Sequence, residues 1–126
     1  MKQVINSPNA PKAIGPYNHA NKGCGLLFVS GQIAFNPTTN ELVLHDIAAE
    51  TRQVLDNLKA IIETAELSLE DVVKCTVFVT DMANYAAINA VYAEYFPGAK
   101  PARYCIKCDL VKPDCLVEIA SVAHIG

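Results

Sequence analysis

The fold of this chain is decided by the stretch Asp71-Val72-Val73-Lys74-Cys75-Thr76-Val77-Phe78-Val79-Thr80. Its many β-branched residues predict a strand. Alternate residues leave a strand on opposite sides, and here both sides are largely apolar. Residues 115–123 have the same property. An antiparallel or mixed sheet that is apolar on both faces needs a cover on each of them.

Two other stretches have the period of an α-helix. Apolar residues recur at positions i, i+3 and i+4 over residues 46–65 and again over residues 82–96. Asp46 and Asp81 are suited to cap the two N-termini, and Pro97-Gly98 ends the second helix. In the first helix we place Glu50 and Arg52 on the polar side. Each helix then has one apolar face, which must lie on another element.

Further strand-like stretches complete the set of elements. They cover residues 2–6, 26–30, 31–35, 102–109 and 115–123. The last two are joined by the turn Lys112-Pro113-Asp114, so we expect these strands to pair antiparallel. The order of strands and helices predicts one α+β domain over residues 1–126, with a mixed six-stranded sheet and two helices on one face.

The composition points to an assembly. The chain has 126 residues, of which 52% are apolar and only 18% are charged. A domain of this size buries about two-thirds of the surface that its unfolded chain exposes. Two helices account for one face of the sheet, and no further element is predicted for the other. A second copy of the chain is the simplest cover, so we expect a homo-oligomer.

Several classes of function are disfavoured. The net charge of −3 does not favour a surface that follows nucleic-acid phosphates. No apolar run approaches the roughly 18 residues of a membrane span. The five cysteines are odd in number and no secretory segment precedes them, so we expect reduced thiols and a cytoplasmic location. In a strand, the sulfurs of Cys105-x-x-Cys108 point apart, which argues against a metal or redox site.

Three polar features do not fit this apolar background. Glu118 stands in the middle of one predicted strand and Arg103 lies inside another. The third feature is the turn Gly15-Pro16-Tyr17, together with Ser30-Gly31. Because the strands of Arg103 and Glu118 are expected to pair, both side chains are expected to reach one region.

Two interpretations of Arg103 and Glu118 remain open from the residue types. One is a structural ion pair inside a subunit interface. The other is a small-anion site. There the guanidinium would hold a carboxylate through two hydrogen bonds. A nearby carboxyl, its pKa raised by apolar walls, would transfer a proton.

Six motifs stand in one order along the chain: Ile14-Gly15-Pro16-Tyr17, Phe28-Val29-Ser30-Gly31-Gln32-Ile33, Val77-Phe78-Val79-Thr80-Asp81, Asn89-x-Val91-Tyr92-x-x-Tyr95-Phe96, Pro101-Ala102-Arg103 and Val117-Glu118-Ile119. Together they resemble the RidA (YjgF-type) family of enamine/imine deaminases, and the spacing between Arg103 and Glu118 also matches. The resemblance covers nearly the whole chain. It implies a chorismate-mutase-like fold, a homotrimer with three clefts between subunits, and no metal or cofactor.

The resemblance also implies roles for individual residues. Arg103 matches the arginine that binds the carboxylate of a 2-imino acid, and Glu118 matches the glutamate that positions or activates the attacking water. Tyr17 matches the tyrosine that closes the cleft. The other pocket residues that it implies are Ser30, Gly31, Asn89 and Cys105.

The chain departs from the family pattern in three places. Tyr104 stands where a small residue is usual, and Ala120 where a second Glu is common. Asn18-His19 replaces a frequent Ser-Gln pair. We expect Tyr104 to point away from Arg103 along the strand, and we interpret His19 as a solvated loop residue rather than a cleft residue.

The function expected from these observations is hydrolysis of 2-iminopropanoate or 2-iminobutanoate to the 2-keto acid and ammonia. Two alternatives belong to other classes. One is an endoribonuclease acting on single-stranded RNA, for which Lys100, Arg103 and Lys107 offer local positive charge and against which the net charge argues. The other is a non-catalytic trimer that binds 2-keto acids or acts as a holdase.

Overall fold

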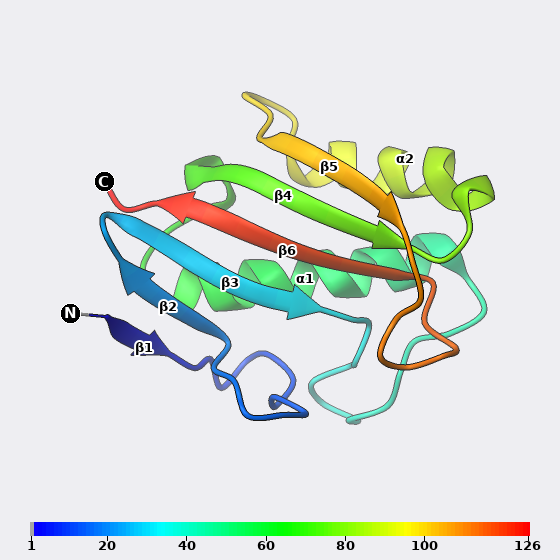
Figure 1. Ribbon diagram of the computed structural model, residues 1–126, viewed down its shortest axis with the longest axis horizontal. Coiled ribbons are helices and arrows are strands. Elements are labelled where there is room, and N and C mark those ends of the chain that lie inside the picture. Colours follow the sequence, from blue (N-terminus) through cyan, green and yellow to red (C-terminus); the bar gives the residue numbers. More distant parts are fainter. Residues whose placement is uncertain (1) are drawn as a thin grey trace.

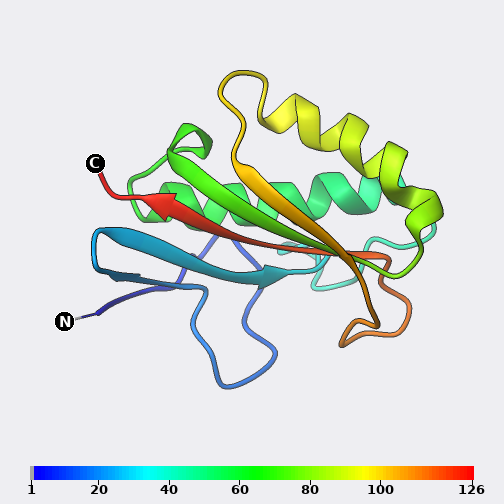
Figure 2. The ribbon, with the colours of Figure 1, turned by 45° about the horizontal axis from the view of Figure 1, so that its top comes forward.

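The structure is a computed structural model that describes residues 2–126. It contains one six-stranded sheet with the order β1-β2-β3-β6-β4-β5, and both helices lie on the same face of it (Figures 1 and 2). The predicted α+β fold is confirmed. The strands are β1 (Gln3–Ile5), β2 (Ala20–Gly23), β3 (Leu26–Gln32), β4 (Val72–Val79), β5 (Ala102–Lys107) and β6 (Val117–His124), and the helices are α1 (Ile47–Thr64) and α2 (Tyr85–Tyr95).

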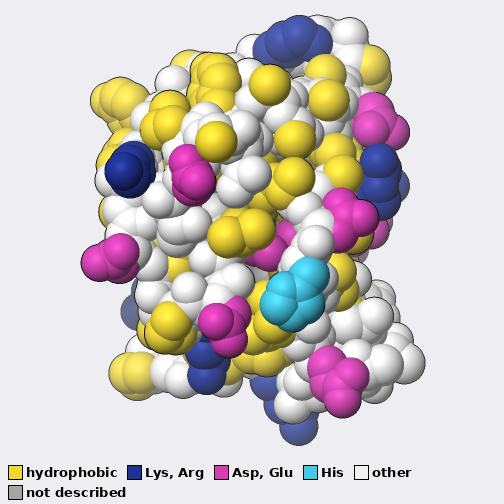
Figure 3. Space-filling model, turned by 90° about the vertical axis from the view of Figure 1, so that its right-hand side faces the viewer, with side chains coloured by type: hydrophobic (Ala, Val, Ile, Leu, Met, Phe, Trp, Pro, Cys, Tyr) yellow, Lys and Arg dark blue, Asp and Glu magenta, His cyan; other side chains and the backbone are white. Residues whose placement is uncertain are grey.

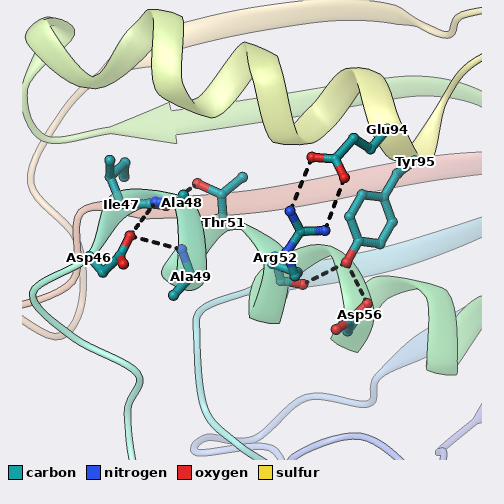
Figure 4. A network of polar contacts seen from close by, with 9 residues as sticks. All are labelled: Asp46, Ile47, Ala48, Ala49, Thr51, Arg52, Asp56, Glu94 and Tyr95. Carbon is teal, nitrogen blue, oxygen red and sulfur yellow. Dashed lines mark hydrogen bonds and ion pairs between the residues drawn. The ribbon is translucent and has the colours of Figure 1, made fainter.

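Helix α1 begins where its capping residue predicts, whereas α2 begins one 3₁₀ turn after its predicted cap. The Asp46 side chain accepts hydrogen bonds from the backbone N–H groups of Ala48 and Ala49 at the start of α1 (Figure 4). Asp81 caps a short 3₁₀ turn, Met82–Asn84, which leads directly into α2. The two helices lie side by side and are tied together by polar contacts of Arg52 with Glu94 and of Tyr95 with Asp56 (Figure 4).

The two faces of the sheet have different surroundings. On the helix-covered face the side chains are buried, among them Val77 and Val79 of β4 and Val117 and Ile119 of β6. The opposite side, here called the open face, has no helix over it within residues 2–126 (Figure 2). Its residues are only partly covered and include Phe28, Lys74, Tyr104, Ile106 and Val122.

The predicted pairing of the last two strands is wrong. Strand β4 lies between β5 and β6, and β5 runs parallel to β4. A parallel pair needs a long crossover, usually a helix, and α2 supplies it between β4 and β5. The chain segment after β5 is then a loop that passes β4 before β6 begins (Figure 1).

Two further expectations about strands are also corrected. Residues 31–35 form no strand of their own, because β3 continues to Gln32 and only an isolated bridge joins Phe35 to Leu42. Strand β2 carries the sequence Ala-Asn-Lys-Gly, which lacks β-branched residues and gives no strand signal. It forms a hairpin with β3 through Cys24 and Gly25, both at positive φ, as a two-residue turn with the right twist requires.

Glu50 lies inside the molecule and not on the polar side of α1. Its side chain is completely buried, and one carboxylate oxygen accepts hydrogen bonds from the backbone N–H groups of Leu116 and Val117 at 2.6 and 3.1 Å. Arg52 is exposed, as expected.

No helix within residues 2–126 has the length and apolar character needed to cross a membrane.

Candidate functional site

Glu118 projects from β6 into a pocket at the end of the sheet where β3 finishes. The pocket has a volume of about 430 Å³, and its wall is mainly apolar. Apolar side chains also gather over this end of the molecule, with acidic side chains around them (Figure 3). The residues that line the pocket are Ile14, Gly15, Tyr17, Ser30, Gly31, Ile33, Val111 and Glu118. Four predicted site residues, Tyr17, Ser30, Gly31 and Glu118, thus come together, and we call them the acid half-site.

The absence of a side chain at Gly31 leaves the space that the carboxyl group of Glu118 occupies. The register between β3 and β6 shifts between Val29 and Gln32, which brings the Gly31 backbone beside Glu118. A Cβ atom added at Gly31 would overlap Oε2 of Glu118 and would lie 3.1 Å from its Cδ. A larger residue here would force the Glu118 carboxyl to move.

The Glu118 carboxyl has no counter-charge among the residues that the structure describes. Burial raises its pKa from the ordinary value of 4.5, and no hydrogen bond or ion pair opposes that rise. The structural ion pair with Arg103 is thus absent from the described chain, in which the salt bridge is Arg52–Glu94. A partly buried carboxyl with a raised pKa and free oxygens is suited to accept and return a proton.

The loop that carries Tyr17 is anchored to Ser30 of the same pocket. Ser30 donates from its hydroxyl to the carbonyl of Asn18 at 2.7 Å and from its backbone N–H to the carbonyl of His19 at 2.9 Å. Tyr17 itself stays 44% exposed at the pocket rim, where its hydroxyl accepts a hydrogen bond from the N–H of Ile14. Tyr17 is placed to cover the pocket without filling it.

His19 is buried, so the expectation of a solvated loop histidine is wrong. Its Nδ1 accepts from the backbone N–H of Ser7 at 2.9 Å, which places the ring proton on Nε2. Nε2 in turn donates to the carbonyl of Pro11 at 2.6 Å. His19 therefore fixes the N-terminal loop and does not line the main pocket.

Arg103 lies on the other side of the sheet, between β5 and α2. Its Nη2 donates to the Tyr85 hydroxyl at 3.0 Å, and its guanidinium carbon stands 4.8 Å from the ring centre of Tyr92. Cys105, on the same strand face as Arg103, has a pKa raised by burial. Tyr104 leaves the strand on the opposite side, as predicted, and stacks under Lys74 on the open face.

Helix α2 presents three polar side chains on the face that meets Arg103. Tyr85, Asn89 and Tyr92 are spaced at i, i+4 and i+7, which aligns them on one side of a helix. The Asn89 Oδ1 atom and the Tyr92 hydroxyl are buried and have no hydrogen-bond partner among residues 2–126. We call the set Tyr85, Asn89, Tyr92, Arg103 and Cys105 the arginine half-site.

The two half-sites do not meet within one chain. Arg103 is in register with Cys75 on β4, whereas Glu118 is in register with Phe78, three residues further along the same strand. The strands that carry them are two positions apart in the sheet, or roughly 10 Å, and their side chains leave it on opposite faces. The expectation that both reach one region is therefore wrong for a single protomer.

Sequence reasoning missed several residues of the two half-sites. Tyr85 and Tyr92 are not among the site residues predicted from the sequence, although their spacing with Asn89 carries the signal of a shared helix face. Ile14 and Ile33 line the same pocket and lie within two of the six motifs, but they were not singled out as site residues. Val111 also lines it, and an isolated apolar residue in a loop gives no signal of this kind. Within the described part of the chain, no group of three or more His, Cys, Asp or Glu side chains could hold a metal ion.

Comparison with known proteins gives one consistent result. The family model described as Endoribonuclease L-PSP matches residues 7–125. YyfA from Yersinia pestis, described as a protein of unknown function in the conserved Rid family, is 42% identical over 98% of this chain and 99% of its own, with a TM-score of 0.94. The YjgF gene product of E. coli is 41% identical over 97% and 98% of the two chains, with a TM-score of 0.91. The chain belongs to the Rid/YjgF family.

A further similar structure contains a bound amino acid. E. coli TdcF, solved with bound serine, is 37% identical over 97% of this chain and 98% of its own, with a TM-score of 0.91. In this Rid chain, the arginine half-site offers a guanidinium for an anion and the acid half-site offers a carboxyl for proton transfer. The separation of the two half-sites is the main fact that any function must accommodate.

Proposed function

We propose that the protein hydrolyses small 2-imino acids, such as 2-iminopropanoate and 2-iminobutanoate, to 2-keto acids and ammonia. The single observation that carries the proposal is the pair of complementary, separate half-sites. Within residues 2–126, Arg103 has no carboxylate partner and Glu118 has no cationic partner. The serine bound to TdcF supports a ligand of this size that bears a carboxylate and a nitrogen on the neighbouring carbon.

The proposal requires a second copy of the chain to complete each site. The arginine half-site of one protomer would meet the acid half-site of the next, a head-to-tail contact that closes into a ring. Apolar residues are available for such contacts, since Phe28 is 48% exposed and Tyr104 59% exposed on the open face. The number three comes from the family resemblance, so a homotrimer is part of the proposal.

The chemistry follows from the two groups. Arg103 holds the substrate carboxylate and so fixes the position of C2, which lowers the entropic part of the barrier. A water attacks C2 of the iminium while Glu118 takes one of its protons, and a carbinolamine forms. Glu118 then returns that proton to nitrogen, and the C–N bond breaks. The hydroxyl proton leaves with the nitrogen, so the products are the 2-keto acid and ammonium.

The test uses 2-iminobutanoate made in place. A threonine dehydratase releases the enamine and imine, and the appearance of 2-ketobutyrate is followed with and without this protein. We expect faster formation with the wild-type chain and no acceleration by Arg103→Ala or Glu118→Gln variants. An unchanged rate with the wild type, or full activity of the Arg103→Ala variant, would contradict the proposal.

The description of the family model supports a second candidate, endoribonuclease activity. The cations named for it do not form one surface with the acid half-site, since none of them lines that pocket. Of these, Lys100 donates to the carbonyl of Phe96. Cleavage of single-stranded RNA that persists in the Glu118→Gln variant would select this candidate. Binding of 2-ketobutyrate without faster imine decay would instead select a non-catalytic ligand-binding trimer.

A further inference from the structure

Tyr85 is the residue that shapes the anion site beside Arg103. It is the first residue of α2, and its ring lies 5.5 Å from the guanidinium carbon of Arg103. Its hydroxyl is 3.0 Å from Arg103 Nη2. The residue is 38% exposed, and its hydrogen bond with Arg103 lies at the surface of the chain.

The direction of this hydrogen bond is fixed by chemistry. A guanidinium has only donors, so Arg103 donates and the Tyr85 oxygen accepts. A phenol accepts and donates at the same time, so the Tyr85 proton remains available. Within residues 2–126 the Tyr85 hydroxyl has no acceptor for it. The free O–H of Tyr85 and the N–H groups of Arg103 thus form a cluster of adjacent donors.

The other tyrosines of α2 show that this arrangement is particular to Tyr85. The Tyr95 hydroxyl lies on the outer side of the helix pair and donates to Asp56 at 2.6 Å (Figure 4). The Tyr92 hydroxyl is buried beneath the guanidinium and cut off from any ligand, and burial raises its pKa. Only Tyr85 of these three combines a free proton with access to solvent and contact with Arg103.

We propose that the Tyr85 hydroxyl donates a hydrogen bond to the substrate carboxylate bound by Arg103 and so acts as a substrate-binding residue of this site. The inference rests on the proposed function, because it takes Arg103 as the carboxylate anchor. One carboxylate oxygen would accept from Arg103 and from Tyr85 together, while the other accepts from the second arm of the guanidinium. The site would then bind a planar carboxylate, which has two acceptor oxygens in one plane, more tightly than an anion with a single acceptor atom.

The experiment compares the Tyr85→Phe and Tyr95→Phe variants with the wild type. Phenylalanine keeps the ring over Arg103 and removes only the hydroxyl. We expect Tyr85→Phe to raise the Kd for 2-ketobutyrate by roughly tenfold to a hundredfold, as for loss of a hydrogen bond to a charged group. The KM for the imine should rise by the same factor with kcat within about twofold, because the carboxylate is bound alike in ground and transition states. The Tyr95→Phe variant should match the wild type.

Each result decides one question. Melting temperature and oligomeric state confirm that both variants are assembled. A Tyr85→Phe variant with wild-type Kd and KM overturns the inference, as does one in which kcat falls while KM is unchanged, since Tyr85 would then only align Arg103. The Arg103→Ala variant separates the two claims: if it binds 2-ketobutyrate as tightly as the wild type, the proposed function itself fails.

Discussion

Glu50 and Glu118 both lie at the start of β6, on opposite faces of the sheet, and burial raises the pKa of both. Glu50 comes from α1 on the helix-covered face, where two backbone N–H groups donate to one of its oxygens. Glu118 lies in a pocket and receives no hydrogen bond from any residue of 2–126. The same residue type is thus structural where the backbone supplies donors and chemically free where it does not.

The largest difference is expected when each glutamate is replaced by glutamine. Glu118→Gln should lower kcat by about 10²–10⁴-fold, the usual contribution of a general base. Glu50→Gln should leave kcat within about threefold, because the amide oxygen still accepts from Leu116 and Val117. The coupled dehydratase assay measures both. Equal losses in the two variants would mean that Glu118 acts through structure and not through proton transfer.

The second prediction tests whether the backbone at Gly31 sets the position of Glu118. A Gly31→Ala substitution should push the carboxyl away, since the new Cβ would overlap Oε2, and should cost roughly tenfold to a hundredfold in kcat/KM. Gly23→Ala is the matched control, because a Cβ there meets nothing within 4 Å. Activity of Gly31→Ala at the level of this control would show that Glu118 is free to move.

For the free energy of unfolding, in contrast to kcat, we expect Glu50 to matter more than Glu118. Glu50→Ala leaves the N–H groups of Leu116 and Val117 buried without an acceptor and opens a cavity, at a cost of about 2–4 kcal/mol in the free energy of unfolding. Glu118→Ala removes no hydrogen bond within the chain and should cost less than about 1 kcal/mol. Denaturant unfolding at pH 7 measures both values. A Glu118→Ala variant that loses as much as Glu50→Ala would contradict the distinction.

The contrast also shows how far the sequence predicts this molecule. Periodicity and capping residues located both helices, because these signals are local: Asp46 and α1 agree within a residue. The pairing of β5 with β4 is not local, and the nearness of residues 102–109 to 115–123 in sequence suggested the wrong neighbour. The error placed Arg103 and Glu118 together in one chain, although both residues were correctly singled out.

The prediction for Glu50 was wrong for a different reason. Charge alone assigned it to the polar side, but it stands four residues before Val54 and so lies on the buried stripe of α1. The spacing of Glu50 and Val54 was visible in the sequence, but the prediction gave more weight to the charge of the glutamate. By contrast, the sequence of β2 contains no pattern that predicts a strand, because β2 is extended only through its hairpin with β3.

A pH titration sharpens the comparison further. Both glutamates have folded-state pKa values above the ordinary value of 4.5, so between that value and the raised one the folded chain binds more protons than the unfolded chain. Their contribution to the free energy of unfolding therefore falls as pH rises through this window. The Glu118→Gln variant should lose part of that slope and melt a few degrees higher than the wild type at pH 7.

Activity should move in the opposite direction over the same window. Glu118 must be ionised to accept a proton from water, so kcat should decrease on acidification with a midpoint above pH 4.5. Thermal melts and kcat measured in the same buffers give both curves. A stability that rises with pH through this range, or an acid limb of kcat below pH 4.5, would mean that burial does not control Glu118.

The smallest effect is expected at a third carboxylate, Glu94, which is exposed and lies 3.0 Å from Arg52 across the two helices (Figure 4). Both partners are about half exposed, so water and salt screen their attraction. Arg52→Gln should lower the melting temperature by less than about 3 °C and should leave kcat unchanged. A larger loss, measured in low and high salt, would mean that this pair holds α2 and the arginine half-site against the sheet. The three glutamates differ in what donates to each of them: backbone N–H groups for Glu50, an exposed guanidinium for Glu94, and no group among residues 2–126 for Glu118. Of the three, Glu118 is therefore the one whose oxygens are free for the proposed proton transfer.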